Sequence, residues 1–290
     1  MDTGYVVVEK IRGKSTVTQS FSKYPLKLIT PNKVGSLKTD AVWIYSLTYG
    51  GGIVSGDRVS CGLTIGEGCT TVFTTQSSTK VYKSVGLKCS EQFLEARIGS
   101  NALLVVIPDP VTCFATARYF QKQVFKMESE SSLIIVDWIT SGRHESGESW
   151  DFKYYKSTNH IFVGDHPLFL DSVLLEEGSI TSIKERMHGY QVIAMLILVG
   201  PKLKQIQNQV QEDAKRVMHE QFYIPATLGY KKRMTSGQTK PDVLVSCSTF
   251  GPKGIGLVVR ISAITTESVY NFLRLHLASM ETLLGAAPYH

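Results

Sequence analysis

A strand–turn–strand pattern occurs three times in the first half of this chain and restricts its fold more than any other feature. In the first copy, every second residue of Val59–Ile65 is apolar, and the turn Gly66–Gly68 follows. This period of two is typical of a β-strand that buries one face. The later copies turn near Gly99 and Glu128, so the pattern recurs about every 30 residues, as in stacked architectures. We therefore expect stacked β-hairpins that form an extended, β-helix-like sheet.

The C-terminal third has a different pattern. Val192–Val199 is continuously apolar, which predicts a strand covered on both faces. Apolar residues then recur at helical spacing after Gly200-Pro201 and again after Thr265. The strand-like runs Asp242–Ser248 and Ile255–Ser262 lie between these two stretches. The predicted order is β-α-β-β-α, a layer that carries two helices.

Together these patterns predict a mainly β fold in two parts. Residues 1–189 form a β-rich body that contains a glycine motif and polar channel residues, and residues 190–290 form the α+β layer. A chain of 290 residues with 43% hydrophobic and 19% charged residues can bury a sizeable core. We expect the two parts to form one continuous domain.

The charge distribution favours protein partners over nucleic acid. The chain has 31 Lys+Arg against 25 Asp+Glu, and this mild excess is spread along it, with Lys231–Arg233 the densest cluster. Nucleic-acid binding needs a concentrated basic face, whereas an acidic protein partner suits the observed balance. The five cysteines are scattered without a C-x-x-C spacing, which argues against a disulfide framework and a zinc knuckle. With no secretory signal and no apolar run long enough to span a bilayer, we expect a cytoplasmic protein without a membrane partner.

The segment Ser46–Asp57 joins two strand-like runs and contains Gly50-Gly51-Gly52 and Ser55-Gly56-Asp57. Glycine adopts positive φ at low cost and permits close approach of another backbone, so a glycine triplet indicates a tight crossing or a site. We expect the glycines to be structural. The acid that follows them is the candidate for function.

Known enzyme motifs are missing from the sequence. It contains no Walker A loop, no dinucleotide fingerprint, no nucleophile elbow and no H-E-x-x-H. The seven histidines are dispersed, and His144-Glu145 with Glu148 is the only compact group of metal-binding side chains. Asp57, Asp109 and Glu148 follow strands or lie in loops, and stacking of the repeated units could bring them together. Carboxylate oxygens bind divalent ions reversibly, which suits handling an ion rather than keeping it.

Five motifs, in order between about residues 20 and 150, resemble the urease accessory protein D family, also called UreH. They are Tyr24-Pro25-Leu26-Lys27, Thr48–Asp57, Thr74-Thr75-Gln76 with Thr79-Lys80-Val81-Tyr82, Pro108-Asp109-Pro110-Val111 with Cys113-Phe114, and Gly142-Arg143 with Gly147-Glu148.

The resemblance implies a non-enzymatic urease maturation factor. Members of the family bind apo-urease and the accessory protein F, and through F they join the accessory GTPase G, which delivers nickel. An internal tunnel is proposed to carry nickel to the urease active site, so no cofactor is permanently bound. By position, the resemblance implies a transient nickel path at Asp57, Asp109 and Glu148. The motifs also contain the polar residues Thr75, Gln76 and Lys80.

Two other interpretations stay open. The chain could be a hydrolase or transferase with a site at the glycine loop, using Ser55, Asp57 and Lys80. It could also be a plain β-scaffold in which the motifs serve packing and no metal passes.

Overall fold

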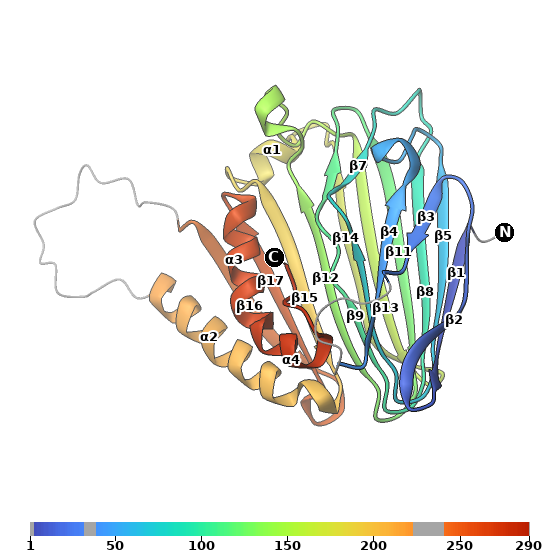
Figure 1. Cartoon of the computed structure of the whole chain (residues 1–290). Helices are drawn as coiled ribbons and strands as arrows, with labels where there is room; N and C mark the ends of the chain where they lie inside the picture. The colour runs from blue at the N-terminus through green and yellow to red at the C-terminus, as the bar shows by residue number, and fades with distance from the viewer. Residues whose placement is uncertain (1–2, 32–38, 223–240, 290) are drawn as a thin grey trace, which may run out of the picture.

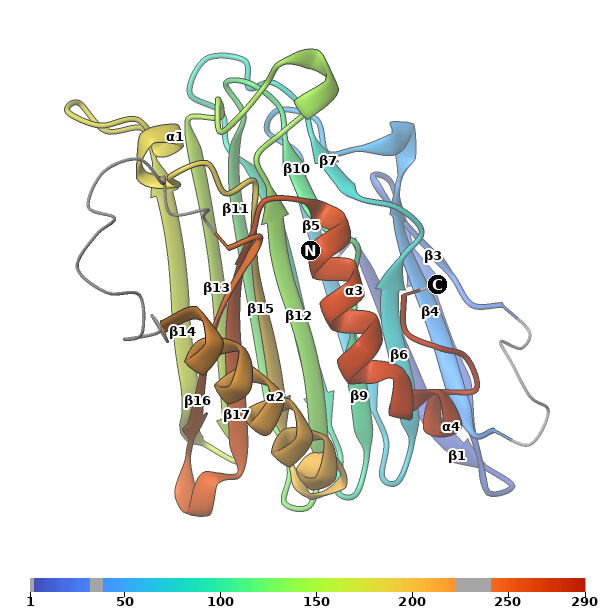
Figure 2. The ribbon, with the colours of Figure 1, turned by 90° about the vertical axis from the view of Figure 1, so that its left-hand side faces the viewer.

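Two β-sheets face each other in this chain, and helices cover the outer face of the second sheet (Figures 1 and 2). The computed structural model describes residues 3–31, 39–222 and 241–289. The protein is mainly β, as predicted.

The first sheet has seven strands within the described residues, in the spatial order β14-β13-β11-β8-β5-β1-β2. Their bounds are β1 (Gly4–Ile11), β2 (Lys14–Ser22), β5 (Arg58–Ile65), β8 (Ser90–Ile98), β11 (Arg118–Met127), β13 (Tyr154–Val163) and β14 (His166–Glu176).

The second sheet runs in the order β16-β17-β15-β12-β9-β6-β4-β3, and β10 pairs with both β12 and β7. Its strands are β3 (Leu26–Ile29), β4 (Ala41–Thr48), β6 (Thr70–Thr75), β7 (Thr79–Val81), β9 (Leu103–Val106), β10 (Val111–Cys113), β12 (Ser132–Thr140), β15 (Val192–Val199), β16 (Val243–Phe250) and β17 (Gly256–Ala263). The helices are α1 (Ile183–Arg186), α2 (Lys204–Phe222), α3 (Thr266–Leu277) and α4 (Glu281–Leu284), with short 3-10 turns η1 (Tyr49–Gly51), η2 (His144–Ser146), η3 (Pro201–Leu203), η4 (Pro252–Gly254) and η5 (Ala278–Met280).

The two strands of each repeated unit lie in opposite sheets. β5, β8 and β11 pair in parallel in the first sheet, while β6, β9 and β12 pair in parallel in the second. The body is therefore β-helix-like, as predicted, but the expected hairpin pairing within each unit is wrong. Alternating hydrophobicity determines which face of a strand is buried and leaves its hydrogen-bonding partner open. The turns carry the chain to the opposite sheet, and the apolar faces of the two strands then pack against each other.

β15 is covered on both faces, as its apolar sequence predicts. Leu196 and Leu198 belong to the core under the helices, and Ile197 and Val199 belong to the core between the sheets. The order β15-α2-β16-β17-α3 matches the predicted β-α-β-β-α layer. Because β15 pairs with β12 of the repeated units, this layer continues the second sheet.

The basic cluster Lys231–Arg233 lies outside the described residues. Among the described residues, no helix combines the length and apolar character needed to cross a bilayer.

Candidate functional site

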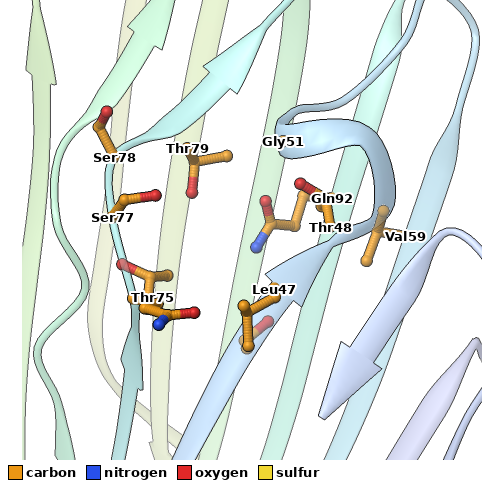
Figure 3. Close-up of a pocket in the computed structure, with 11 residues that line it drawn as sticks. Leu47, Thr48, Gly51, Val59, Thr75, Ser77, Ser78, Thr79 and Gln92 are labelled. Atoms are coloured by element: carbon orange, nitrogen blue, oxygen red, sulfur yellow. The ribbon is translucent and has the colours of Figure 1, made fainter. Parts of the chain in front are cut away.

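An opening between the two sheets lies beside the glycine loop (Figure 3). Most of its lining consists of hydroxyl and amide side chains from the end of β4, from β8 and from the β6–β7 segment, and β5 adds Val59. The lining residues are Ser46, Leu47, Thr48, Gly51, Val59, Thr75, Gln76, Ser77, Ser78, Thr79 and Gln92. Such side chains both donate and accept hydrogen bonds, so they can replace part of the water around a hydrated ion.

The glycines let two backbone segments cross at this opening. Gly50 and Gly51 have φ values of +77° and +75°, which other residues adopt at a cost. A Cβ on Gly52 would lie 2.7 Å from the carbonyl oxygen of Lys80. The next residue, Ile53, donates its N–H to that oxygen at 2.8 Å. The structural interpretation of the glycines is confirmed, because a side chain at Gly52 would force the two segments apart.

A second cavity adjoins the opening and lies deeper between the sheets. The two cavities share Ser46, Thr75, Thr79 and Gln92. The inner cavity reaches Asp109 and Asp137 and has a volume of about 40 Å³. This is much smaller than the roughly 300–1,000 Å³ typical of sites for drug-sized organic ligands. We refer to the two cavities together as the polar lane; its inner part suits water or a small ion.

Asp137 projects from β12 into the polar lane and meets side chains of the first sheet. Its Oδ2 accepts hydrogen bonds from the Ser157 hydroxyl at 2.6 Å and from Asn159 Nδ2 at 2.7 Å. Its Oδ1 accepts one from Gln121 Nε2 at 3.1 Å. All three donors are neutral, and no described lysine, arginine or histidine forms an ion pair with this carboxylate.

Burial raises the pKa of Asp137 above its ordinary value. The hydrogen bonds from Ser157, Asn159 and Gln121 oppose this rise, because they stabilise the charged form, and the negative charge of Asp171 adds to it. A buried carboxylate without a positive partner is unfavourable when charged. A cation that entered the polar lane would supply this missing partner and would stabilise the charged form of Asp137.

Asp171 is a second acidic side chain near this network. It lies on β14 opposite Asn159, and its Oδ1 accepts a hydrogen bond from Arg260 Nη2 at 2.8 Å. Its Oδ2 is buried and has no hydrogen-bond partner among the described residues. Acidic and amide groups therefore continue past Asp137 toward the β14 edge of the body.

Of the predicted residues, Asp109 and Thr75 meet in the polar lane. The backbone N–H of Asp109 donates to the Thr75 hydroxyl at 2.9 Å, and Asp109 Oδ1 accepts a hydrogen bond from the Tyr270 hydroxyl at 2.7 Å. Burial raises the pKa of Tyr270. The hydrogen bond to Asp109 and the negative charge of Asp109 raise the pKa of Tyr270 further. Gln76 is exposed at the opening, and Lys80 is exposed on β7.

Asp57 and Glu148 have local partners. Asp57 Oδ2 accepts the N–H of Val54 at 3.2 Å and closes a turn. Glu148 forms an ion pair with Arg143, whose Nε lies 3.1 Å from Oε2, and accepts the N–H of Ala115 at 3.2 Å. The hydrogen bond from Arg143 is the main cause of the lowered pKa of Glu148, and burial opposes it. Within the described ranges, no three His, Cys, Asp or Glu side chains form a group that could hold a metal ion.

Ser55, the nucleophile of the enzyme interpretation, also has a local role. Its Oγ accepts the N–H of Val85 at 2.8 Å. In the described part of the chain, no histidine or carboxylate forms a hydrogen bond with this hydroxyl that could remove its proton.

Asp137 and its amide and hydroxyl neighbours were not among the site residues predicted from the sequence. A signal was present in β11, where Gln121 and Gln123 occupy the same alternating positions as the buried Tyr119 and Phe125. Polar residues in the buried phase of a strand need partners inside the protein, so this pattern indicates an internal polar network.

Comparison with known proteins identifies the family of this chain. The family model described as "UreD urease accessory protein" matches residues 3–290. The urease accessory protein D of Arabidopsis thaliana is 63% identical over 293 residues, which cover 100% of both chains. That of Oryza sativa subsp. japonica is 57% identical, over 99% of this chain and 94% of the relative. An Anaeromyxobacter protein named urease accessory protein UreD is 30% identical, over 99% of this chain and 88% of the relative. The chain belongs to the UreD urease accessory protein family.

Proposed function

We propose that this chain is a non-catalytic urease maturation factor that binds apo-urease and passes nickel through its polar lane. In this proposal the accessory protein F binds the chain directly, and the accessory GTPase G joins through F. Nickel is the cargo and is bound only in transit. The observation that carries the proposal is Asp137, a buried carboxylate that accepts hydrogen bonds from three neutral side chains and forms no ion pair within the described residues.

The ligand chemistry of the lane supports transit rather than storage. One carboxylate with amide and hydroxyl oxygens attracts a divalent cation but holds it weakly. A lasting site would gather imidazole or thiolate groups, and the described residues contain no such group of three. Asp109 lines the same inner cavity as Asp137, so it is the predicted path residue that the geometry favours most.

The other predicted residues remain part of the proposal. Thr75 and Gln76 would replace water around the ion at the opening, where both side chains line the cavity. Asp57, Lys80 and Glu148 would act near the entrance, because their side chains contribute to the charge of the loops around it. The enzyme interpretation places its site at the glycine loop and the plain β-scaffold requires no cavity, so neither predicts a buried carboxylate in the inner cavity.

Asp137→Asn tests the proposal, because it removes the charge and keeps the shape of the side chain. We expect this variant to bind apo-urease normally and to lower urease activation at limiting nickel by about tenfold or more, as losses around metal ligands commonly do. Asp165→Asn, in the exposed β13–β14 turn, is the matched control. Full activation by Asp137→Asn, with wild-type nickel content in the urease, would show that the lane does not carry the ion.

A further inference from the structure

The hydroxyl of Tyr119 lies between the side-chain amides of two glutamines. It is 2.9 Å from Gln92 Oε1 and 3.0 Å from Gln121 Oε1. Burial raises the pKa of Tyr119 well above its ordinary value, so the hydroxyl keeps its proton at neutral pH. A hydroxyl has one proton to donate, so it serves only one of the two oxygens at a time. The other amide can bond to Tyr119 only after a half-turn, which places its NH2 group against the hydroxyl oxygen.

These three side chains connect the opening of the polar lane to Asp137. Gln92, on β8, lines both the opening and the inner cavity (Figure 3). Gln121, on β11, lines the inner cavity, where its Nε2 donates to Asp137 Oδ1 at 3.1 Å. The buried ring of Tyr119 stacks on the ring of Tyr155 at 6.0 Å, which holds the hydroxyl in place. The parts that can turn are therefore one hydroxyl proton and two amide groups.

The chain of hydrogen bonds can run in either of two directions. In the first, Gln92 donates to Tyr119, and Tyr119 donates to Gln121. Gln121 then donates to Asp137, as in the observed contact. In the second direction both amides have turned, so that Gln121 donates to Tyr119 and Tyr119 donates to Gln92. The oxygen of Gln121 then faces the carboxylate of Asp137, and the two repel each other unless a cation lies between them.

We propose that Tyr119 is a positioning residue that couples the opening of the polar lane to Asp137, so that divalent cations pass one at a time. This inference rests on the proposed function and deepens it. A cation at Asp137 favours the second direction, because the oxygen of Gln121 then joins its ligands. Gln92 turns its NH2 group away from Tyr119 and toward the opening, where it disfavours a following cation. When the first cation has left, the first direction returns and Gln92 again offers its oxygen to the opening.

The test measures nickel binding to the isolated full chain, by competition with a chromophoric chelator. Gln92→Leu removes the acceptor that Tyr119 needs in the second direction. The buried hydroxyl would then lack an acceptor, so we expect the dissociation constant for nickel to rise about fivefold or more. In a Tyr119→Phe background the same substitution should change the constant less than about twofold, because the effect of Gln92 on Gln121 passes through the hydroxyl.

Tyr190→Phe is the matched control background. Tyr190 is also buried, and its hydroxyl donates to Pro241 O at 3.1 Å, outside the polar lane. In this background Gln92→Leu should raise the dissociation constant for nickel as it does in the wild type. Gln121→Met is a second test background, used in addition to Tyr119→Phe or where that variant does not fold. It removes the inner amide, so Gln92→Leu should again have little effect.

Four outcomes separate this inference from the proposed function. An effect of Gln92→Leu that disappears with Tyr119→Phe supports the coupling. Equal effects of Gln92→Leu in the two backgrounds overturn it, because Gln92 then acts as a ligand or a packing residue on its own. The nickel lane stands in that case, provided that Asp137→Asn weakens nickel binding. Wild-type nickel affinity of Asp137→Asn, or no nickel binding by the unaltered chain, contradicts both the proposed function and this inference.

Discussion

Asp109 Oδ1 and the Tyr270 hydroxyl, 161 positions apart in the sequence, lie 2.7 Å apart and join the β-body to helix α3. Asp109 belongs to the wall of the polar lane, and the ring of Tyr270 packs edge-on against Trp138 at 4.8 Å. The helical layer therefore positions one carboxylate of the lane, although the helices themselves lie on the outer face of the second sheet.

Tyr270→Phe is expected to destabilise the protein by about 1.5 kcal/mol, the low end for a hydrogen bond to a charged group. The phenyl ring keeps the contact with Trp138, so the loss reports the hydroxyl alone. Urea unfolding measures the change, and Tyr24→Phe, at an exposed tyrosine, should shift the free energy of unfolding by less than about 0.5 kcal/mol. Equal stability of Tyr270→Phe and wild type would mean that water replaces the bond to Asp109 without loss.

Gly52→Ala is expected to cost about 1–3 kcal/mol of folding stability, the usual penalty for an added methyl group in a packed region. The new Cβ would approach Lys80 O and a ring carbon of Tyr82 to 2.7 and 2.8 Å. Gly62→Ala is the control, because its Cβ would meet only Tyr5 Cβ at 3.7 Å. Thermal unfolding should show a lower midpoint for the first variant and not for the second; equal midpoints would mean that the crossing segments separate freely.

A periodic pattern in the sequence encodes only part of the fold. Alternation in Val59–Ile65 identifies the strand and its buried face, because side chains of a strand alternate between its two sides. It does not identify the neighbouring strand, since hairpins and coils of a β-helix bury the same residues. The helices after Gly200 and Thr265 were predictable for a simpler reason: apolar residues recur at helical spacing in both, Pro201 marks the start of the first, and the Thr265 side chain caps the second.

The site was only partly predictable. Asp109 and Thr75 stand in recognisable motifs, so the sequence identified them. Asp137 stands in an apolar strand with buried positions throughout, and its partners come from β11 and β13 of the other sheet. Only the packing of the two sheets against each other brings these groups together. The glutamines in the buried phase of β11 indicate an internal polar network, but not which residue of β12 faces them.

Charge-only substitutions test the predicted role of Asp57 and Glu148 in the nickel path. Asp57→Asn and Glu148→Gln keep an oxygen that can accept the N–H of Val54 or Ala115, so the loops should stay folded. We expect both variants to bind apo-urease and to activate it less than wild type at limiting nickel. Activation assays over a range of nickel concentrations measure this. Wild-type activation by both variants would mean that the two acids hold their loops in place and take no part in the nickel path.

The pH dependence of stability provides a test of Asp137 that does not involve urease. Its native pKa is raised above the ordinary value of 3.8, mainly by burial, so the native state binds the proton more tightly than the unfolded state does. The stability that this proton contributes is present in full below pH 3.8 and is lost as the pH rises through the native pKa. Asp137→Asn has no proton to lose. Between pH 3.8 and the native pKa of Asp137, the stability of the variant relative to wild type should therefore increase with pH, by at most about 1.4 kcal/mol per pH unit.

Urea unfolding at several pH values measures that difference, and Asp165→Asn is the control because its exposed carboxylate lies outside the network. Glu148 changes wild-type stability in the opposite direction, since its lowered pKa gives stability that is lost as the pH falls. Both proteins contain Glu148, so its contribution cancels when the variant is compared with wild type. Parallel stability curves for Asp137→Asn and wild type would mean that Asp137 titrates like a carboxylate in water, and a neutralising partner would then have to lie beside it. A relative stability that grows with pH would instead show that the native state disfavours the charge on Asp137, as expected for a buried carboxylate that lacks a positive partner.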